Sequence, residues 1–134
     1  MTLQLWKDPV EKKLDPTLFS TQAEAFARQI SSEATWKINK STQLRKFFDE
    51  ILRLNTLAEA TDADWNLVLP QVHMVIAKSA YAKGRELVSE SFVNHVREGI
   101  TQIHTPEDLK IFTTHMEAFI GFYKMFEEQK KHRR

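Results

Sequence analysis

The sequence predicts an all-α protein, a compact bundle of about five helices, and three observations favour this fold class. Apolar residues recur at intervals of three and four over most of the chain, which is the spacing of one helix face. Only three glycines and four prolines occur in 134 residues, which leaves little material for hairpin turns. Signals for helix starts and stops divide the chain into segments of helical length. The length suits one domain with its own core.

The composition excludes several classes of protein. No cysteine is present, so disulfides, thiolate catalysis and thiolate metal sites are excluded. A net charge of +1 does not by itself indicate a nucleic-acid partner, so that argument depends on how the charges are distributed. No apolar run approaches the roughly twenty residues of a membrane helix, and Lys7 and Asp8 precede any signal-peptide core. We therefore expect a cytoplasmic protein without membrane contact.

The chain divides into an N-terminal arm, residues 1–14, and a single helical-bundle domain over residues 15–134 that ends in a basic tail. The arm mixes apolar and charged residues without a clear period, and it could dock through Trp6. The dipeptide Asp15-Pro16 supplies an N-cap and a proline that suits the first helical position. We therefore expect the first helix to begin there and to end near Ser31.

A loop over residues 32–40 separates the first two helices, because the helical periodicity lapses there. Ser41 or Thr42 can cap the second helix, in which apolar residues recur at helical spacing as far as Ala58. Trp36 lies in the loop between lysines, where it could stack on a nucleobase or pin the loop to the bundle.

The third helical region carries clear start and stop signals. Thr61 or Asp62 can cap its first part, and Pro70 has the fixed φ that suits a first helical turn. We therefore expect a break near Leu69, and a main helix that begins at Pro70 and ends where Gly84 takes the left-handed conformation.

Two further helices complete the predicted bundle. Ser89 is a candidate cap for the fourth helix, and Thr105 with Asp108 has the pattern of a box-like cap for the fifth. The fifth helix, from Pro106 to about Lys130, is apolar on two sides, so it is either central to the bundle or partly covered by another chain. Members of its second side are candidates for such a contact: Ile111, Phe122 and Met125.

Two stretches of the chain contain basic residues and no acidic residue. The first basic stretch is residues 34–48, and the second basic stretch is residues 65–85. Their cations are Lys37, Lys40, Arg45, Lys46, Lys78, Lys83 and Arg85. Lys78, Tyr81 and Arg85 follow one another at intervals of three and four, so they share one face of the third helix. Cations held on folded helices without neighbouring acids can bind phosphate groups.

No catalytic or metal-binding motif accompanies these stretches, and we expect no enzyme activity, metal site or cofactor. The five histidines include no pair at the spacing of a helical zinc site with its intervening glutamate. A DNA-reading helix-turn-helix around Gly84 would place Glu86, Glu90 and Glu98 against the phosphates. From the residues alone, two functions remain open: binding to a nucleic-acid backbone, and a helical adaptor module that binds only protein partners.

Three segments of the chain carry a recognisable pattern, both in their order and in their spacing. They are STQLRKFF at 41–48, KSAYAKGR at 78–85, and EAF at 117–119 with FYK at 122–124. These segments resemble the small subunit of the type III-A CRISPR effector, the Csm complex, and the resemblance covers roughly residues 38–126.

The resemblance implies a small helical subunit of a ribonucleoprotein that acts in antiviral defence. Such a subunit has no active site, and several copies stack beside the backbone subunits and the large subunit of the Csm complex, along paired guide RNA and target RNA. The resemblance implies that the RNA backbone is contacted by Arg45, Lys46, Lys78 and Arg85, and we add Lys37, Lys40, Tyr81 and Lys83 beside them. The second side of the fifth helix then becomes a candidate surface for neighbouring copies.

Overall fold

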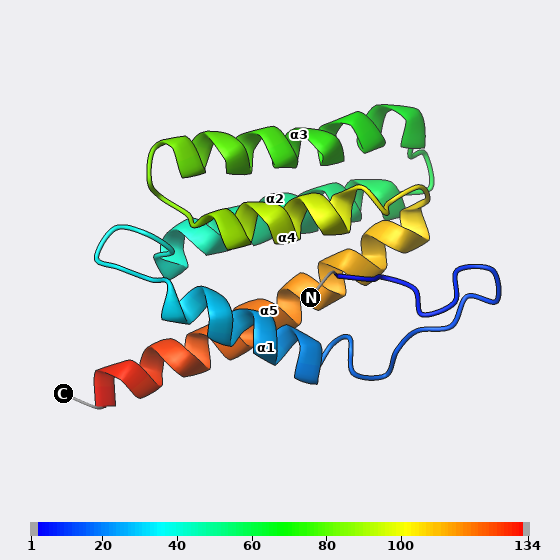
Figure 1. The fold of residues 1–134 in the computed structure, drawn as a ribbon. Coiled ribbons are helices and arrows are strands. Elements are labelled where there is room, and N and C mark those ends of the chain that lie inside the picture. Colours follow the sequence, from blue (N-terminus) through cyan, green and yellow to red (C-terminus); the bar gives the residue numbers. More distant parts are fainter. Residues whose placement is uncertain (1–2, 133–134) are drawn as a thin grey trace.

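The computed structural model describes residues 3–132, and the fold of this part of the chain is an all-helical bundle without β-strands (Figure 1). The helices are α1 (Thr21–Ser32), α2 (Ser41–Glu59), α3 (Trp65–Gly84), α4 (Glu90–Ile100) and α5 (Pro106–His132). The predicted fold class is confirmed. None of these helices combines the length and the apolar character that a membrane span needs.

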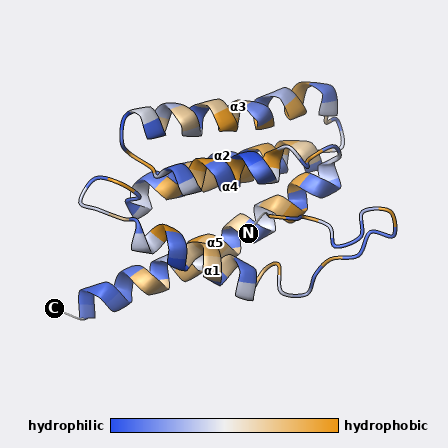
Figure 2. Ribbon diagram, in the orientation of Figure 1, coloured by the Kyte–Doolittle hydropathy of each residue, from blue (hydrophilic) through white to orange (hydrophobic). Residues whose placement is uncertain are grey.

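Helix α5 is the longest element, and it contacts α1, α2 and α4 (Figure 1). Helix α3 lies on the opposite side of the bundle from α5 and packs only against α2 and α4 to a substantial extent. Figure 2 shows that every helix carries both hydrophobic and hydrophilic residues, and that the C-terminal end of α5 is mostly hydrophilic. Helix α5 is therefore central for most of its length, which is the first of the two alternatives that its two apolar sides left open.

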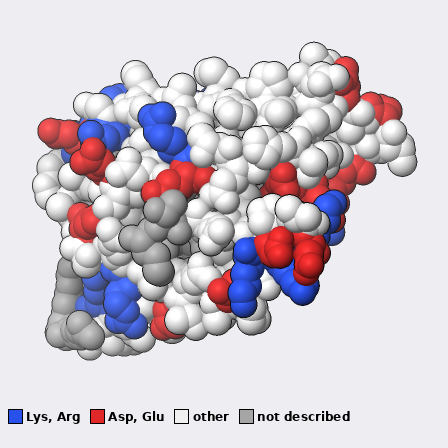
Figure 3. All heavy atoms as spheres, turned by 45° about the vertical axis from the view of Figure 1, so that its right-hand side comes forward, with Lys and Arg blue, Asp and Glu red and all other residues white. Residues whose placement is uncertain are grey.

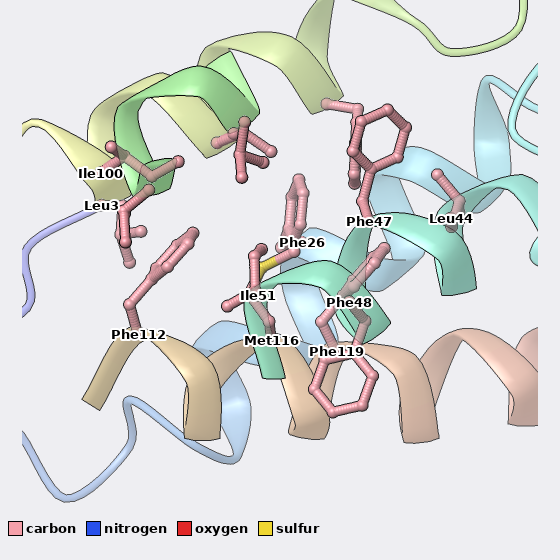
Figure 4. Packing of buried hydrophobic residues seen from close by; sticks show 14 of the residues in the cluster. Leu3, Phe26, Leu44, Phe47, Phe48, Ile51, Ile100, Phe112, Met116 and Phe119 are labelled. Carbon is pink, nitrogen blue, oxygen red and sulfur yellow. The ribbon is translucent and has the colours of Figure 1, made fainter. Parts of the chain in front are cut away.

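Aromatic rings from four helices form the centre of the core. Figure 4 shows the rings of Phe26, Phe47 and Phe119 among the buried side chains. The rings of Phe26 and Phe119 have centroids 4.6 Å apart, and the ring of Phe92 lies 5.5 Å from that of Phe47. Phe92 and Phe119 are completely buried. Because each buried phenylalanine contributes roughly 1.5–3 kcal/mol, this cluster holds α1, α2, α4 and α5 together without a disulfide.

The predicted start of the first helix at Asp15 is wrong, because α1 begins at Thr21. The Asp15 carboxylate accepts hydrogen bonds from the backbone N–H of Thr17 at 2.8 Å and from its hydroxyl at 2.6 Å. These two bonds lower the pKa of Asp15. Such local bonds compete with helix formation, so the Asp-Pro pair begins a turn and α1 begins five residues after Pro16, the predicted first helical position.

The predicted break before Pro70 is also wrong, because α3 runs unbroken from Trp65. Asp64, and neither Thr61 nor Asp62, caps this helix: its carboxylate accepts a hydrogen bond from the backbone N–H of Asn66 at 3.0 Å. Pro70 lies in the second turn, where its missing N–H removes one intrahelical hydrogen bond. The capped first turn and packing on α2 and α4 offset that loss.

The predicted N-cap of α2 and the predicted left-handed residue at the end of α3 are each displaced by one or two residues. The N-cap of α2 is Lys40, and neither Ser41 nor Thr42 makes a side-chain capping bond. Gly84 keeps an ordinary negative φ as the last residue of α3, and Glu86 takes the left-handed conformation with φ 60°. The helix closes with a paired set of bonds, from Leu87 N–H to the Ala82 carbonyl and from Glu86 N–H to the Lys83 carbonyl, which requires the left-handed residue at 86.

Asp108 joins the N-terminal arm to the start of α5. One carboxylate oxygen accepts a 2.7 Å bond from the indole N–H of Trp6, and the other accepts from the backbone N–H of Thr105 at 3.1 Å. The hydroxyl of Thr105 accepts in return from the backbone N–H of Asp108, so the predicted capping box is confirmed. Leu3 and Leu5 of the arm are buried in the core.

The second side of α5 does not form a free apolar surface, contrary to the prediction. Ile111 is buried, with 7% of its surface exposed, and Phe122 packs partly against the core. Met125 is exposed at 38%. The candidate contact with neighbouring copies is therefore reduced to the region around Met125.

Candidate nucleic-acid interface

The two basic stretches meet at one end of the bundle. The first basic stretch forms the α1–α2 loop and the start of α2, and the second basic stretch is α3. The backbone N–H of Asn39, in that loop, donates to the carbonyl of Leu87, just after α3, at 2.9 Å. In Figure 1 the α1–α2 loop and the α3–α4 loop lie together at the left end of the bundle.

Asn39 holds this end of the bundle together, and sequence reasoning missed it. The residue is buried, with 1% of its surface exposed, and its φ of 62° is a left-handed conformation that asparagine tolerates better than most residues. Its amide group donates to the Ile30 carbonyl at 3.2 Å and to the Ser89 hydroxyl at 3.0 Å. Its side-chain oxygen accepts from the backbone N–H of Ser89 at 2.9 Å. We call these contacts the Asn39 latch.

A side chain of α5 completes the Asn39 latch. The hydroxyl of Tyr123 donates a hydrogen bond to the backbone carbonyl of Asn39. Burial, with a contribution from nearby Glu127, raises the pKa of Tyr123 to about 12, so its hydroxyl keeps its proton. The latch therefore joins α1, α4 and α5 to the loop that carries the first basic stretch.

An open cleft of about 440 Å³ lies between α2 and α3, and we call it the α2–α3 cleft. Its cations come from both basic stretches: Lys46 from α2, with Lys78 and Arg85 from α3. Tyr81 and Glu50 also line it. Because cations from two distant segments face one space, the cleft has the composition of a site for a polyanion.

Some of the predicted cations are paired with carboxylates of the same molecule. The exposed pairs are Lys37–Glu86 at 3.7 Å and Arg45–Asp49 at 3.2 Å, whereas the exposed Lys78 contacts the half-buried Glu50 at 3.1 Å. Exposed ion pairs contribute only about 0–1 kcal/mol, so a phosphate group can replace the carboxylate at little cost. Over residues 3–132, no carboxylate oxygen lies within 4.0 Å of the other predicted cations, Lys40, Lys46, Lys83 and Arg85.

The Glu50 carboxylate has a second cationic partner besides Lys78. The guanidinium group of Arg53 donates two bonds to the Glu50 carboxylate, at 2.8 and 3.0 Å. Hydrogen bonding to Arg53, followed by the contact with Lys78, lowers the pKa of Glu50 to about 2 although partial burial opposes the shift. If Lys78 turns to a phosphate group, Glu50 keeps its second cation.

A second cleft, of about 420 Å³, lies on the other side of α2 against α5, and we call it the α2–α5 cleft. Its floor includes Ile120 and Tyr123, and its cations are Arg45, Lys46 and Lys124. Lys46 lines both clefts, so its side chain lies between them. Sequence reasoning did not select Lys124; its only signal was the FYK segment of the resemblance.

The remaining predicted residues lie beside the clefts. Lys40 and Lys83 are exposed at the same end of the bundle and line neither cleft. Trp36 is 83% exposed, so it does not pin the α1–α2 loop to the bundle, and stacking on a base stays a prediction. Tyr81 is 68% exposed, and the guanidinium carbon of Arg85 lies 5.8 Å from its ring centroid.

The opposite end of the bundle has a different charge. Glu59, Asp62 and Asp64 are exposed where α2 turns into α3. Figure 3 brings the right-hand side of the molecule forward, and the face drawn there shows acidic and basic side chains mixed, without a continuous basic surface. Within the described part of the chain, no group of three or more histidine, aspartate or glutamate side chains could hold a metal ion.

The described part of the chain is a small helical bundle in which cations from two distant segments gather at one end, beside a loop held by buried hydrogen bonds. The family model described as Csm2 Type III-A matches residues 13–129. The chain therefore belongs to the Csm2 family, the small subunit of the type III-A CRISPR effector, the Csm complex, which is a non-catalytic structural component of that complex. Comparisons with curated proteins and with solved structures gave no match. The predicted resemblance to this family is confirmed, and the match begins at residue 13, before the predicted extent of about 38–126.

Proposed function

We propose that the basic end of this subunit holds guide RNA or target RNA by its sugar–phosphate backbone, without reading the sequence. The observation that carries the proposal is the convergence of the two basic stretches on the α2–α3 cleft, where Lys46, Lys78 and Arg85 face one space. Contacts to phosphate position a nucleic acid but carry no sequence information, which suits a subunit that serves guides of any sequence.

The cations divide into three roles within this proposal. Lys46 and Arg85, which have no carboxylate partner within 4.0 Å over residues 3–132, bind phosphate directly. Arg45 exchanges the exposed Asp49 for a phosphate group. Lys78 exchanges the half-buried Glu50, which keeps its bonds to Arg53. The remaining cations raise the positive potential around the clefts: Lys37, Lys40 and Lys83.

The partners of the subunit in this proposal are neighbouring copies of the same chain and the backbone and large subunits of the Csm complex, in the cytoplasm. Several copies along one RNA supply avidity, so each copy can bind weakly on its own. A net charge of +1 supports this arrangement, because strongly positive copies would repel one another.

The test is to change Lys78 and Arg85 together to Ala and to measure the affinity for unrelated single-stranded RNAs over a series of salt concentrations. We expect weaker binding to every sequence, since phosphate contacts are lost. The slope of log affinity against log salt should become shallower by roughly 0.7 for each lost contact.

A matched control is the change of Arg97 and Lys110 together to Ala, since both are exposed and line neither cleft. This control should keep the wild-type slope. A Lys78→Ala, Arg85→Ala protein that folds normally and keeps the wild-type slope would contradict the proposed function.

A further inference from the structure

We infer that the α2–α3 cleft is also a nucleobase site, in which one unstacked base of the RNA lies on the ring of Tyr81. The inference rests on the proposed function, because it names what the same cleft takes besides phosphate. It has a consequence that phosphate binding lacks: the subunit should bind single-stranded RNA more tightly than fully paired RNA.

The two tyrosines of the chain differ in what they contact. Tyr123 is buried, and its hydroxyl donates to the Asn39 carbonyl. Tyr81 is 68% exposed, and its hydroxyl makes no hydrogen bond within residues 3–132. Tyr81 therefore contributes little to the packing of the bundle, although its ring lines an open cleft.

The cations beside Tyr81 are placed for the phosphates on either side of a bound base. Lys78 precedes Tyr81 by three residues and Arg85 follows it by four, so both lie on the same face of α3. The guanidinium carbon of Arg85 is 5.8 Å from the centroid of the Tyr81 ring. Lys46 lines the opposite wall, on α2. A nucleotide whose base lay on Tyr81 would thus have cations near both of its phosphates.

Stacking on an aromatic ring does not select a sequence, because every base has a π-face. It does select single strands, because in a continuous duplex both faces of each base are covered by its neighbours. A single ring on a helix surface can therefore receive only a base that has left the stack. The cleft volume of about 440 Å³ leaves room for one such base beside its phosphates.

The experiment compares the full chain with its Tyr81→Leu and Tyr81→Phe variants, using one RNA oligonucleotide as a single strand and as a fully paired duplex at fixed salt. Tyr81→Leu should weaken single-strand binding about tenfold and leave duplex binding within about twofold. Tyr81→Phe keeps the ring and should bind like the wild type. The salt slope should be unchanged in both variants, since no cation is lost.

The matched control is Met74→Ala, because Met74 is 54% exposed on the same face of α3 but does not line the cleft. This variant should bind like the wild type. Since Tyr81 and Met74 are both exposed, the helical circular dichroism signal and the urea midpoint should match the wild type in all variants.

Two results would overturn the base site while the proposed function stands: wild-type affinity of Tyr81→Leu for the single strand with a normal salt slope, or equal losses in the Leu and Phe variants. Failure of the wild type to bind RNA in a salt-dependent way would instead remove the proposed function itself. The two failures are therefore distinguishable.

Discussion

The Asn39 latch and the α2–α3 cleft lie at the same end of the bundle, but opposite kinds of polar contact build them. In the latch, the polar groups are neutral, and both polar atoms of the buried Asn39 side chain make hydrogen bonds. In the cleft, the cations are exposed, and Lys78 can exchange its ion pair because Arg53 keeps Glu50 paired. Residues of the latch therefore contribute to stability, and residues of the cleft contribute to binding. A substitution in one of the two regions should change one property and leave the other unchanged.

The largest effect on stability is expected for Asn39→Ala. The substitution removes the three side-chain bonds of the latch, leaves the backbone N–H of Ser89 without its partner, and places alanine in a left-handed conformation. We expect the free energy of unfolding to fall by about 3 kcal/mol, as measured by urea unfolding.

Asn39→Gly separates the two causes, because glycine loses the same bonds but adopts the left-handed conformation readily. It should be more stable than Asn39→Ala by about 1 kcal/mol. A loss below about 1 kcal/mol in Asn39→Ala would show that the latch does not hold this end of the bundle.

A histidine pair in the core, with His115 buried and His95 half-buried, gives the next largest effect. The Nε2 atoms of His95 and His115 are 2.9 Å apart, and Nδ1 of His115 lies 2.8 Å from the Leu18 carbonyl oxygen. If Nδ1–H of His115 donates to Leu18, then its Nε2 accepts from Nε2–H of His95, and both rings are neutral. Burial, with a smaller effect of His115, lowers the pKa of His95 to about 3. Burial also lowers the pKa of His115, although the bond to Leu18 opposes the shift.

Acid should therefore destabilise the fold through His95. Because its pKa is about 3 in the folded chain and 6.5 ordinarily, the unfolded chain binds the proton more tightly. The contribution is complete above pH 6.5 and is lost as the pH falls toward 3. We expect a loss of about 2 kcal/mol between pH 6.5 and 5, measured by urea unfolding at each pH.

Replacement of His95 by glutamine should make this pH dependence shallower. The matched control is His73→Gln, since His73 is exposed on α3, and it should keep the wild-type dependence. Equal pH dependence in the wild type and in His95→Gln would show that this pair does not carry the effect.

The sequence alone predicted those parts of the fold that depend on local contacts. Helical periodicity placed the five helices, and the Thr105–Asp108 capping box is made by residues of one turn. At Asp15, local hydrogen bonds to Thr17 formed a turn in place of the expected helix start. At Pro70, the capped first turn and packing on α2 and α4 offset the lost hydrogen bond. Asn39 could not be selected from the sequence, because its partners lie 9 and 50 residues away.

The sequence identified most residues of the candidate site, but it did not predict the two clefts that they line. The absence of acids identified both basic stretches, yet it gave no sign that Glu50 and Asp49 would reach Lys78 and Arg45 from just outside the first stretch. That Lys46 lines both clefts follows only from the packing of α2 between α3 and α5. A charge pattern shows which side chains lack local partners, whereas the tertiary fold decides which of them share a space.

The most direct test of this separation is a measurement of both properties in Lys46→Glu, because Lys46 is exposed, unpaired within residues 3–132 and common to both clefts. The account predicts that its affinity for single-stranded RNA at low salt falls at least about tenfold. The free energy of unfolding should change by less than about 0.5 kcal/mol. Unchanged affinity, or a loss of affinity that appears only with a matching loss of stability, would contradict the account.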